Sequence, residues 1–292
     1  MSSRIRPRRS VLYMPGSNSR AIEKGREIAA DCLILDLEDA VHPDAKAAAR
    51  DQVLAAVKQG GFGHREVVIR INGLGTPWGA EDLQLAAQSE ADAILLSKVE
   101  SGAEIEAASE LLSRRGTAKM AIWAMAETPR GIIDLDMITR NQSRLEVIVM
   151  GTSDLTKELR IRSADQRSGL IHALSASLLA ARANGLDIID GVHLTLDDAE
   201  GFDAACRQGR ELGFDGKSLI HPRQIAAANK IFGISQAEVD HAREIETAWR
   251  EASAAGKGVI VVRGQLIEQL HVDEAKRLLI LYSQMSAREQ QK

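Results

Sequence analysis

Apolar residues along this chain gather in short continuous runs, which recur between segments whose apolar positions have helical spacing, such as "NSRAIEKGREIAA" and "AEDLQLAAQSEA". The runs do not alternate apolar with polar residues, and such continuity is typical of parallel strands covered on both faces. We therefore predict eight strands, within residues 10–16, 31–39, 66–73, 91–98, 119–127, 145–151, 186–191 and 213–220.

This alternation of strands and helices predicts an α/β fold, a (β/α)8 TIM barrel. An open, doubly wound sheet is the alternative, and a phosphate-binding loop after the first strand would favour it. The segment "YMPGSNSRAIEK" has neither the G-x-G-x-x-G nor the Walker spacing, so we prefer the closed barrel.

The pattern changes after the eighth run. "PRQIAAANKIF" is predicted to be the last barrel helix, and a long helix should follow, beginning at Ser235 with Glu238 completing a capping box. A short hairpin around residues 263–264 and a final helix complete the chain. We therefore expect a catalytic TIM-barrel domain over residues 1–232 and an extension over residues 233–292 that serves as a lid or subunit contact.

The composition is aliphatic and mildly acidic. Lys and Arg number 37 against 41 Asp and Glu, a formal net charge of −4 over 292 residues, so no nucleic-acid partner is expected. The basic "RIRPRR" near the start reads as a solvated terminus rather than a secretory signal, and no run is long enough to span a membrane. Cys32 and Cys206 lack metal or redox spacing, which predicts reduced side chains in a cytoplasmic protein.

Charged residues follow the predicted strands at the points where the strands end, including Asp187 and Asp190 in the seventh run and Lys217 in the eighth, so we expect a ring of charges. In a (β/α)8 barrel these ends meet at one mouth, where catalytic residues lie. Carboxylates predominate there, and oxygen ligands without a Cys cluster or His pair suit Mg²⁺, with Mn²⁺ as the alternative, better than Zn²⁺. Glu127 and Asp154 follow the fifth and sixth runs and form the best pair of metal ligands. For each, capping a helix or pairing with an arginine is the alternative.

Arg70 ends the third run after "VVI", so it should point into the mouth and grip a carboxylate or enolate oxygen. A salt bridge from Arg70 to Glu38 or Asp39 is the other interpretation, and both can hold together. For Glu38 and Asp39, orienting Arg70 or holding water is at least as plausible as direct metal ligation.

The turn at residues 151–154, "GTSD", is expected to aim backbone N–H groups at the metal region as a small anion-binding nest. Lys98 and His221 also follow strands, and a structural role is the simpler interpretation of each.

Six motifs in register resemble a known family: "RRSVLYMPGSNSRAIEKG", "LILDLEDAV", "VIRING", "AMAETPRGI", "MGTSDL" and "FDGKSLIHPRQI". They resemble the citrate lyase beta-subunit-like and malyl-CoA lyase proteins of the HpcH/HpaI aldolase superfamily, which are Mg²⁺-dependent (β/α)8 barrels. "TPWGAEDL", "MGTSDLTKEL" and "GVIVVRGQLIEQLH" look most like the branch that holds malyl-CoA lyase and (3S)-malyl-CoA thioesterase.

The resemblance implies a role for each matching position. These positions are Glu127 and Asp154 for Mg²⁺, Arg70 for the substrate, the backbone of Gly151, Thr152 and Ser153 for the oxo-acid carboxylate, and Arg20 and Lys24 for the phosphates of coenzyme A. Family members are homotrimers or homohexamers in which the C-terminal segment of one subunit covers the next barrel. In the lyases that segment brings an acid/base aspartate, and Glu268 in "GQLIEQLH" stands at the matching position with one more methylene.

Three functions remain open. The first is a Mg²⁺-dependent lyase that cleaves a malyl-CoA, methylmalyl-CoA or citramalyl-CoA-like ester, with Arg70, Glu38, Asp39 and Glu268 as catalytic candidates. The second is a (3S)-malyl-CoA thioesterase that uses the same metal site. The third is the beta subunit of a citrate lyase complex that acts on a carrier-bound acyl group. The expected partners in the first two are a CoA ester, a 2-oxo acid and further copies of the chain.

Overall fold

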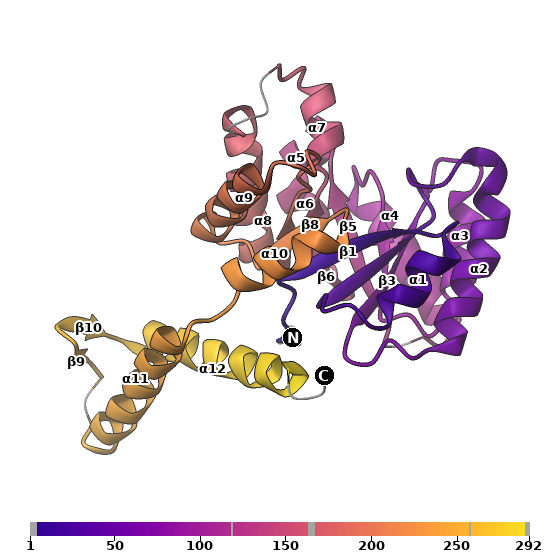
Figure 1. Ribbon diagram of the computed structural model, residues 1–292. Coiled ribbons are helices and arrows are strands. Elements are labelled where there is room, and N and C mark those ends of the chain that lie inside the picture. The colour runs from indigo at the N-terminus through magenta and orange to yellow at the C-terminus, as the bar shows by residue number, and fades with distance from the viewer. Residues whose placement is uncertain (1–4, 118, 163–166, 257, 290–292) are drawn as a thin grey trace. The chain divides into compact units, whose positions relative to one another are not determined.

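The computed structural model describes residues 5–117, 119–162, 167–256 and 258–289 (Figure 1). The chain divides into two compact units. The first runs from Arg8 to Phe232, and the second starts at Gly233 and includes residues 5–7 from the beginning of the chain.

The first unit is a closed barrel of parallel strands, in the order of the sequence, with β1 pairing β8 to complete the ring (Figure 1). The expected (β/α)8 fold is therefore confirmed, and each predicted run contains one strand. The strands are β1 Ser10–Pro15, β2 Cys32–Asp36, β3 Glu66–Ile71, β4 Ala93–Leu96, β5 Ala121–Ala126, β6 Leu145–Met150, β7 Asp187–Asp190 and β8 Gly216–Leu219.

Helices connect these strands on the outside of the barrel. The α-helices of this unit are α1 Ser19–Gly25, α2 Lys46–Gln59, α3 Gly79–Ala86, α4 Gly102–Arg114, α5 Pro129–Ile133, α6 Leu135–Thr139, α7 Thr152–Glu158, α8 Ile171–Ala183, α9 Ala199–Leu212 and α10 Ile225–Ile231. Single turns of 3₁₀-helix precede α2, α8 and α10; they are η1 Pro43–Ala45, η2 Ser168–Leu170 and η3 Pro222–Gln224.

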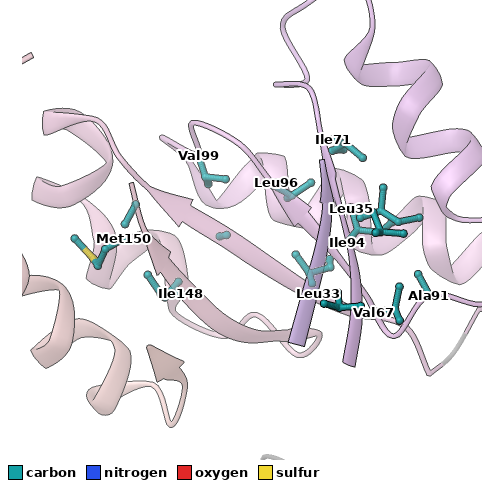
Figure 2. Packing of buried hydrophobic residues seen from close by; sticks show 14 of the residues in the cluster. Leu33, Leu35, Val67, Ile71, Ala91, Ile94, Leu96, Val99, Ile148 and Met150 are labelled. Carbon is teal, nitrogen blue, oxygen red and sulfur yellow. The ribbon is translucent and has the colours of Figure 1, made fainter. Parts of the chain in front are cut away.

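The continuous apolar runs are explained by two buried layers. On β2, Cys32 and Ile34 face the barrel interior, whereas Leu33 and Leu35 pack against the surrounding helices. Figure 2 shows Leu33 and Leu35 in the outer layer. Because successive strand residues point to opposite faces and both faces are covered, an apolar residue is needed at nearly every position.

Arg8 closes the end of the barrel where the strands begin. Its fully buried guanidinium donates to both carboxylate oxygens of Glu66, at 2.8 and 2.9 Å, and to Asp187 at 2.5 Å. It also pairs with Glu146 and lies over the ring of Trp123, 5.3 Å from the centroid. The sequence suggested that Asp187 belongs to the catalytic mouth, which is wrong: Asp187 is the first residue of β7, so it lies at the opposite end.

The second unit contains α11 Gln236–Ala254, the hairpin strands β9 Ile260–Val262 and β10 Gln265–Ile267, and α12 Gln269–Glu289. The hairpin around residues 263–264 and the capping box of Ser235 with Glu238 are as predicted. Residues 5–7 also belong to this unit, where Gln284 donates to the carbonyl of Ile5 and Arg288 to that of Pro7. Across the described residues of both units, none of the helices has the length and apolarity needed to cross a membrane.

Candidate active site

The end of β2 is held by the carboxylate of Asp36. Its two oxygens accept the backbone N–H groups of Glu38 at 2.8 Å and Ala40 at 3.2 Å, so the chain turns sharply after the strand. A buried lysine on α2 supports the same turn, because Lys46 Nζ donates to the carbonyls of Leu37 and Glu38. Neither Asp36 nor Lys46 is among the predicted site residues, although both contact the backbone of Glu38.

Arg70, the fifth residue of β3, is gripped by Asp36 in a bidentate pair. The distances are 2.7 Å from Nε to Oδ1 and 2.6 Å from Nη2 to Oδ2, and Nη1 lies 3.1 Å from Glu38. The guanidinium lies 4.8 Å from the centroid of the Tyr13 ring inside the barrel. Although burial lowers its pKa, Asp36 outweighs that effect and holds the pKa of Arg70 well above its usual value. The predicted salt bridge from Arg70 to Glu38 is present, but the main partner of Arg70 is Asp36.

Glu38 is buried and fully engaged. One carboxylate oxygen accepts from Lys98 Nζ at 2.6 Å, and the other meets Arg70 and the backbone N–H of Asp39. Burial raises the pKa of Glu38, but Arg70 and then Lys98 outweigh it, so the carboxyl stays ionised. Asp39 is more exposed, and burial together with the charge of Glu38 raises its pKa. Glu38 therefore orients the two cations.

Lys98 follows β4 with a backbone φ of 53°, in the left-handed region that non-glycine residues rarely adopt. Its backbone N–H donates to Glu127 Oε1 at 2.8 Å, and its Nζ lies 3.4 Å from Asp154 Oδ2. Burial lowers the pKa of Lys98, yet the hydrogen bond and charge of Glu38 raise it overall, so the ammonium is charged. One residue thus contacts carboxylates from three strand ends.

Glu127 immediately follows β5 and is only 3% exposed. Proline at position 129 begins α5, with the hydroxyl of Thr128 capping the helix, so the strand ends at a rigid turn. Burial, followed by the charge of Glu38, raises the pKa of Glu127 to about 7. Its Oε2 passes within 2.5 Å of the place a Cβ on residue 151 would occupy, so a glycine is needed there.

The "GTSD" turn begins α7. The N–H of Gly151 donates to the carbonyl of Ala126, so it is not available to a ligand as the nest prediction requires. The N–H groups of Thr152 and Ser153 lie in the first turn, where a helix offers no carbonyl partner. Asp154, in the same turn, is partly exposed.

A cavity of about 620 Å³ adjoins this turn. Thr152, Ser153, Arg167 and His193 are among the residues that line it. Arg167 is held by a bidentate pair with Asp190 at 2.7 and 2.6 Å.

The residues expected around the eighth strand have structural roles. Lys217 is buried and donates to Asp190 at 2.8 Å and to the carbonyl of Gly191 at 2.6 Å. His221 caps η3, with its Nδ1 accepting the N–H of Arg223. Neither residue contacts Glu127 or Asp154, so the expected ring of charges covers only part of the mouth.

The remaining candidates lie away from this cluster. Arg20 and Lys24 are exposed one helical turn apart on α1, after β1. Glu268 belongs to the second unit, between β10 and α12, where its backbone N–H donates to His271 Nδ1 and its side chain is exposed.

The donors of the mouth fit a hard divalent cation. Its five carboxylates are those of Asp36, Glu38, Asp39, Glu127 and Asp154. Within the described residues their ion pairs come only from Arg70 and Lys98, and an excess of negative charge remains. The described residues contain no group of three or more His, Cys, Asp or Glu side chains arranged as a metal cage. Mg²⁺ needs no such cage, because it uses one or two carboxylates and completes its coordination with water and substrate.

The fold and the site define a TIM-barrel protein with an acidic catalytic mouth. Residues 9–222 match the family model described as HpcH/HpaI aldolase/citrate lyase, and the chain belongs to this family. It is 44% identical over 279 residues to a (3S)-malyl-CoA thioesterase of Cereibacter sphaeroides, with 96% of each chain covered. It is also 31% identical over 307 residues to the L-malyl-CoA/beta-methylmalyl-CoA lyase of the same species, covering 97% of this chain and 96% of the relative.

A solved structure is also similar to this chain. The protein CitE from Mycobacterium tuberculosis, in complex with magnesium, acetoacetate and coenzyme A, superposes with a TM-score of 0.73 at 30% identity. The match covers 94% of this chain and 97% of that one. The predicted family is therefore confirmed, as is the enzyme class, a carbon–carbon lyase or a closely related CoA thioesterase.

Proposed function

We propose that this chain is a Mg²⁺-dependent acyl-CoA lyase that cleaves a malyl-CoA, methylmalyl-CoA or citramalyl-CoA-like ester by a retro-aldol reaction. The observation that carries the proposal is Glu127, a buried carboxylate on a rigid strand end. It accepts the backbone N–H of Lys98, whose ammonium lies 3.4 Å from Asp154. Glu127 and Asp154 would hold the metal, with Mn²⁺ as a substitute. The bound ion supplies Lewis-acid stabilisation of negative charge on oxygen.

Arg70 binds and orients the substrate. A guanidinium has five N–H groups, and three of those of Arg70 are engaged with Asp36 and Glu38. Two remain for an anionic oxygen of the substrate, while the pairing fixes the plane of the group. The N–H groups of Thr152 and Ser153 serve the oxo-acid carboxylate, and the cavity beside them leaves room for a methyl substituent.

In the retro-aldol direction a base removes the proton of the β-hydroxyl group, and the bond between Cα and Cβ of the acyl chain breaks. The 2-oxo acid leaves, and the enolate of the shortened acyl thioester takes up a proton at carbon. Glu268 from a neighbouring copy of the chain is our candidate for the acid/base group, since its carboxylate is exposed and ends a hairpin. This assignment requires a homotrimer or homohexamer in which the extension acts as lid.

Arg20 and Lys24 are proposed to meet the phosphates of coenzyme A, because both are exposed cations on one face of α1. The buried, free thiols of Cys32 and Cys206 support a reducing, cytoplasmic location.

A (3S)-malyl-CoA thioesterase is the second candidate, favoured by the 44% identity to such an enzyme. In that case water attacks the thioester, and the same metal site and Glu268 would serve hydrolysis.

The two functions differ in their products from malyl-CoA and Mg²⁺. We expect glyoxylate and acetyl-CoA from the purified protein; free CoA and malate without glyoxylate would identify the thioesterase instead. Silence in both assays would favour a subunit that needs a carrier protein. Glu127→Gln should lower either activity at least about 100-fold, because a neutral amide is a poor metal ligand. Glu106→Gln, on the exposed face of α4, is the matched control. Full activity of Glu127→Gln would contradict the metal site.

A further inference from the structure

Lys98 has two unusual features in one residue. Its backbone adopts the left-handed conformation at φ 53°, which costs free energy for any residue with a Cβ. Such strain persists where the surrounding structure needs it, often at functional sites. Here the left-handed backbone aims the N–H at Glu127 Oε1, 2.8 Å away, while the side chain reaches the other acidic groups.

The ammonium of Lys98 has unequal contacts. Its Nζ makes a short hydrogen bond of 2.6 Å to Glu38 Oε1, but Asp154 Oδ2 is 3.4 Å away and Asp39 Oδ2 is 4.0 Å away. The contact to Asp154 is thus mainly electrostatic, and it can open while the bond to Glu38 remains. The side chain is 42% exposed, so the ammonium has room to move toward solvent.

We propose that Lys98 is an internal counter-cation of the acidic mouth, which a divalent metal displaces from Asp154 when it binds. The inference rests on the proposed metal site at Glu127 and Asp154. A metal ion at Asp154 and an ammonium 3.4 Å from the same carboxylate repel each other strongly in a half-buried site. Lys98 therefore competes with the metal for Asp154 and weakens its binding, while its backbone N–H keeps Glu127 oriented.

The backbone and the side chain of Lys98 therefore have separate roles, which substitutions can test independently. The N–H of residue 98 positions Glu127 and does not depend on the side chain. The ammonium neutralises the mouth before the metal arrives and sets how tightly the metal is held. Lys98→Gly removes the ammonium, retains the N–H donor and suits a positive φ. Lys98→Asn does the same with a side chain that tolerates the left-handed region.

The test is a titration of the purified full chain with Mn²⁺, in which electron paramagnetic resonance reports free Mn²⁺. We expect both Lys98→Gly and Lys98→Asn to bind Mn²⁺ about tenfold more tightly than the natural sequence, since a nearby positive charge is lost. Asn141→Gly is the control for the backbone, because Asn141 is an exposed left-handed residue at φ 62° without charge. Its Mn²⁺ affinity should be unchanged.

Unchanged or weaker Mn²⁺ binding in both Lys98 variants would overturn the counter-cation role, provided that the natural sequence binds the ion. Glu127→Gln separates this result from failure of the metal site. If the natural sequence and Glu127→Gln bind Mn²⁺ equally, or neither binds it, the metal site is wrong, and the role of Lys98 falls with it.

Discussion

The two ends of the barrel use the same kinds of side chain for different purposes. At the end where strands begin, Arg8 lies over Trp123 and is surrounded by carboxylates of Glu66, Glu146 and Asp187. At the other end, Arg70 lies over Tyr13 and is paired with acidic residues that follow β2. Each arginine therefore closes the interior with a cation–π contact and with ion pairs.

The two ends differ in how completely their carboxylates are paired with cations. Arg8 is fully buried and joins carboxylates from β3, β6 and β7, so it ties three strands together. At the mouth, Glu127 has only a backbone N–H donor in the described structure, and Lys98 and Asp154 are partly exposed. The closed end thus stabilises the fold, and the open end retains negative charge for a ligand, in agreement with the general division of TIM barrels.

The largest expected effect comes from breaking the closed end. Arg8→Met should lower the free energy of unfolding by about 3–5 kcal/mol, because buried carboxylates lose their cation. Urea denaturation measures this, and Arg8→Lys serves if the first variant does not fold. Arg114→Met, which removes an exposed ion pair on α4, should change stability by less than about 0.5 kcal/mol. The comparison fails if the folded Arg8 variant loses Mn²⁺ affinity instead of stability.

A smaller effect, of a different kind, is expected at the mouth. Arg70→Lys should lower kcat/KM on the order of 100-fold, about 2.7 kcal/mol, because lysine cannot hold Asp36 in a bidentate pair and still offer N–H groups to the substrate. Its loss of unfolding free energy should be below that of Arg8→Met. Kinetics together with urea denaturation decide the matter: the opposite ranking would mean that Arg70, too, is mainly structural.

The smallest expected effect is the pH dependence of stability. Both ends of the barrel contribute to it, but only the contribution of the mouth should respond to Mg²⁺. Burial raises the pKa of Glu127 to about 7 and, with Asp215 nearby, that of Asp187 to about 6. A carboxyl with a raised pKa in the folded state binds protons more readily there, so the metal-free protein loses stability as pH rises from about 4 to about 7. We expect the melting temperature in EDTA to fall by a few degrees across this range.

Added Mg²⁺ should recover only the part due to Glu127, since a metal favours the ionised carboxylate there and leaves Asp187 unaffected. Glu127→Gln should therefore remove the response to Mg²⁺ and keep the slope due to Asp187. Thermal melts at several pH values provide the measurement. An equal Mg²⁺ response in both proteins would place the stabilising ion elsewhere.

Features of the fold that depend on a local signal could be predicted from the sequence. The eight apolar runs predicted all eight barrel strands, because strands buried on both faces need apolar residues at most positions. Ser235 and Glu238 predicted the start of α11 from their spacing alone. At the mouth, counting the strand ends found Glu127, Asp154, Glu38 and Arg70, which the structure brings into one connected cluster.

Contacts that depend on strand register and on closure of the barrel could not be predicted. Asp36 and Arg70 are neighbours across β2 and β3, a pairing that needs the register of two strands. Asp187 and Asp190 are the first and last residues of the same four-residue strand. An error of a few residues in the predicted strand bounds is therefore enough to place Asp187 at the wrong end of the barrel. The left-handed backbone of Lys98 could not be predicted, because no glycine or turn motif marks that position.

The sequence by itself determined the order of elements, the parallel barrel and the identity of the acidic strand ends, because these follow from periodicity along the chain. Only the tertiary structure decided which groups meet: Arg70 with Asp36, Lys98 with carboxylates from three strand ends, and Arg8 with carboxylates from three strands. The physical reason is that closing the barrel brings together groups distant in sequence. Burial there raises the pKa of Glu127 to about 7, and no local pattern encodes that change.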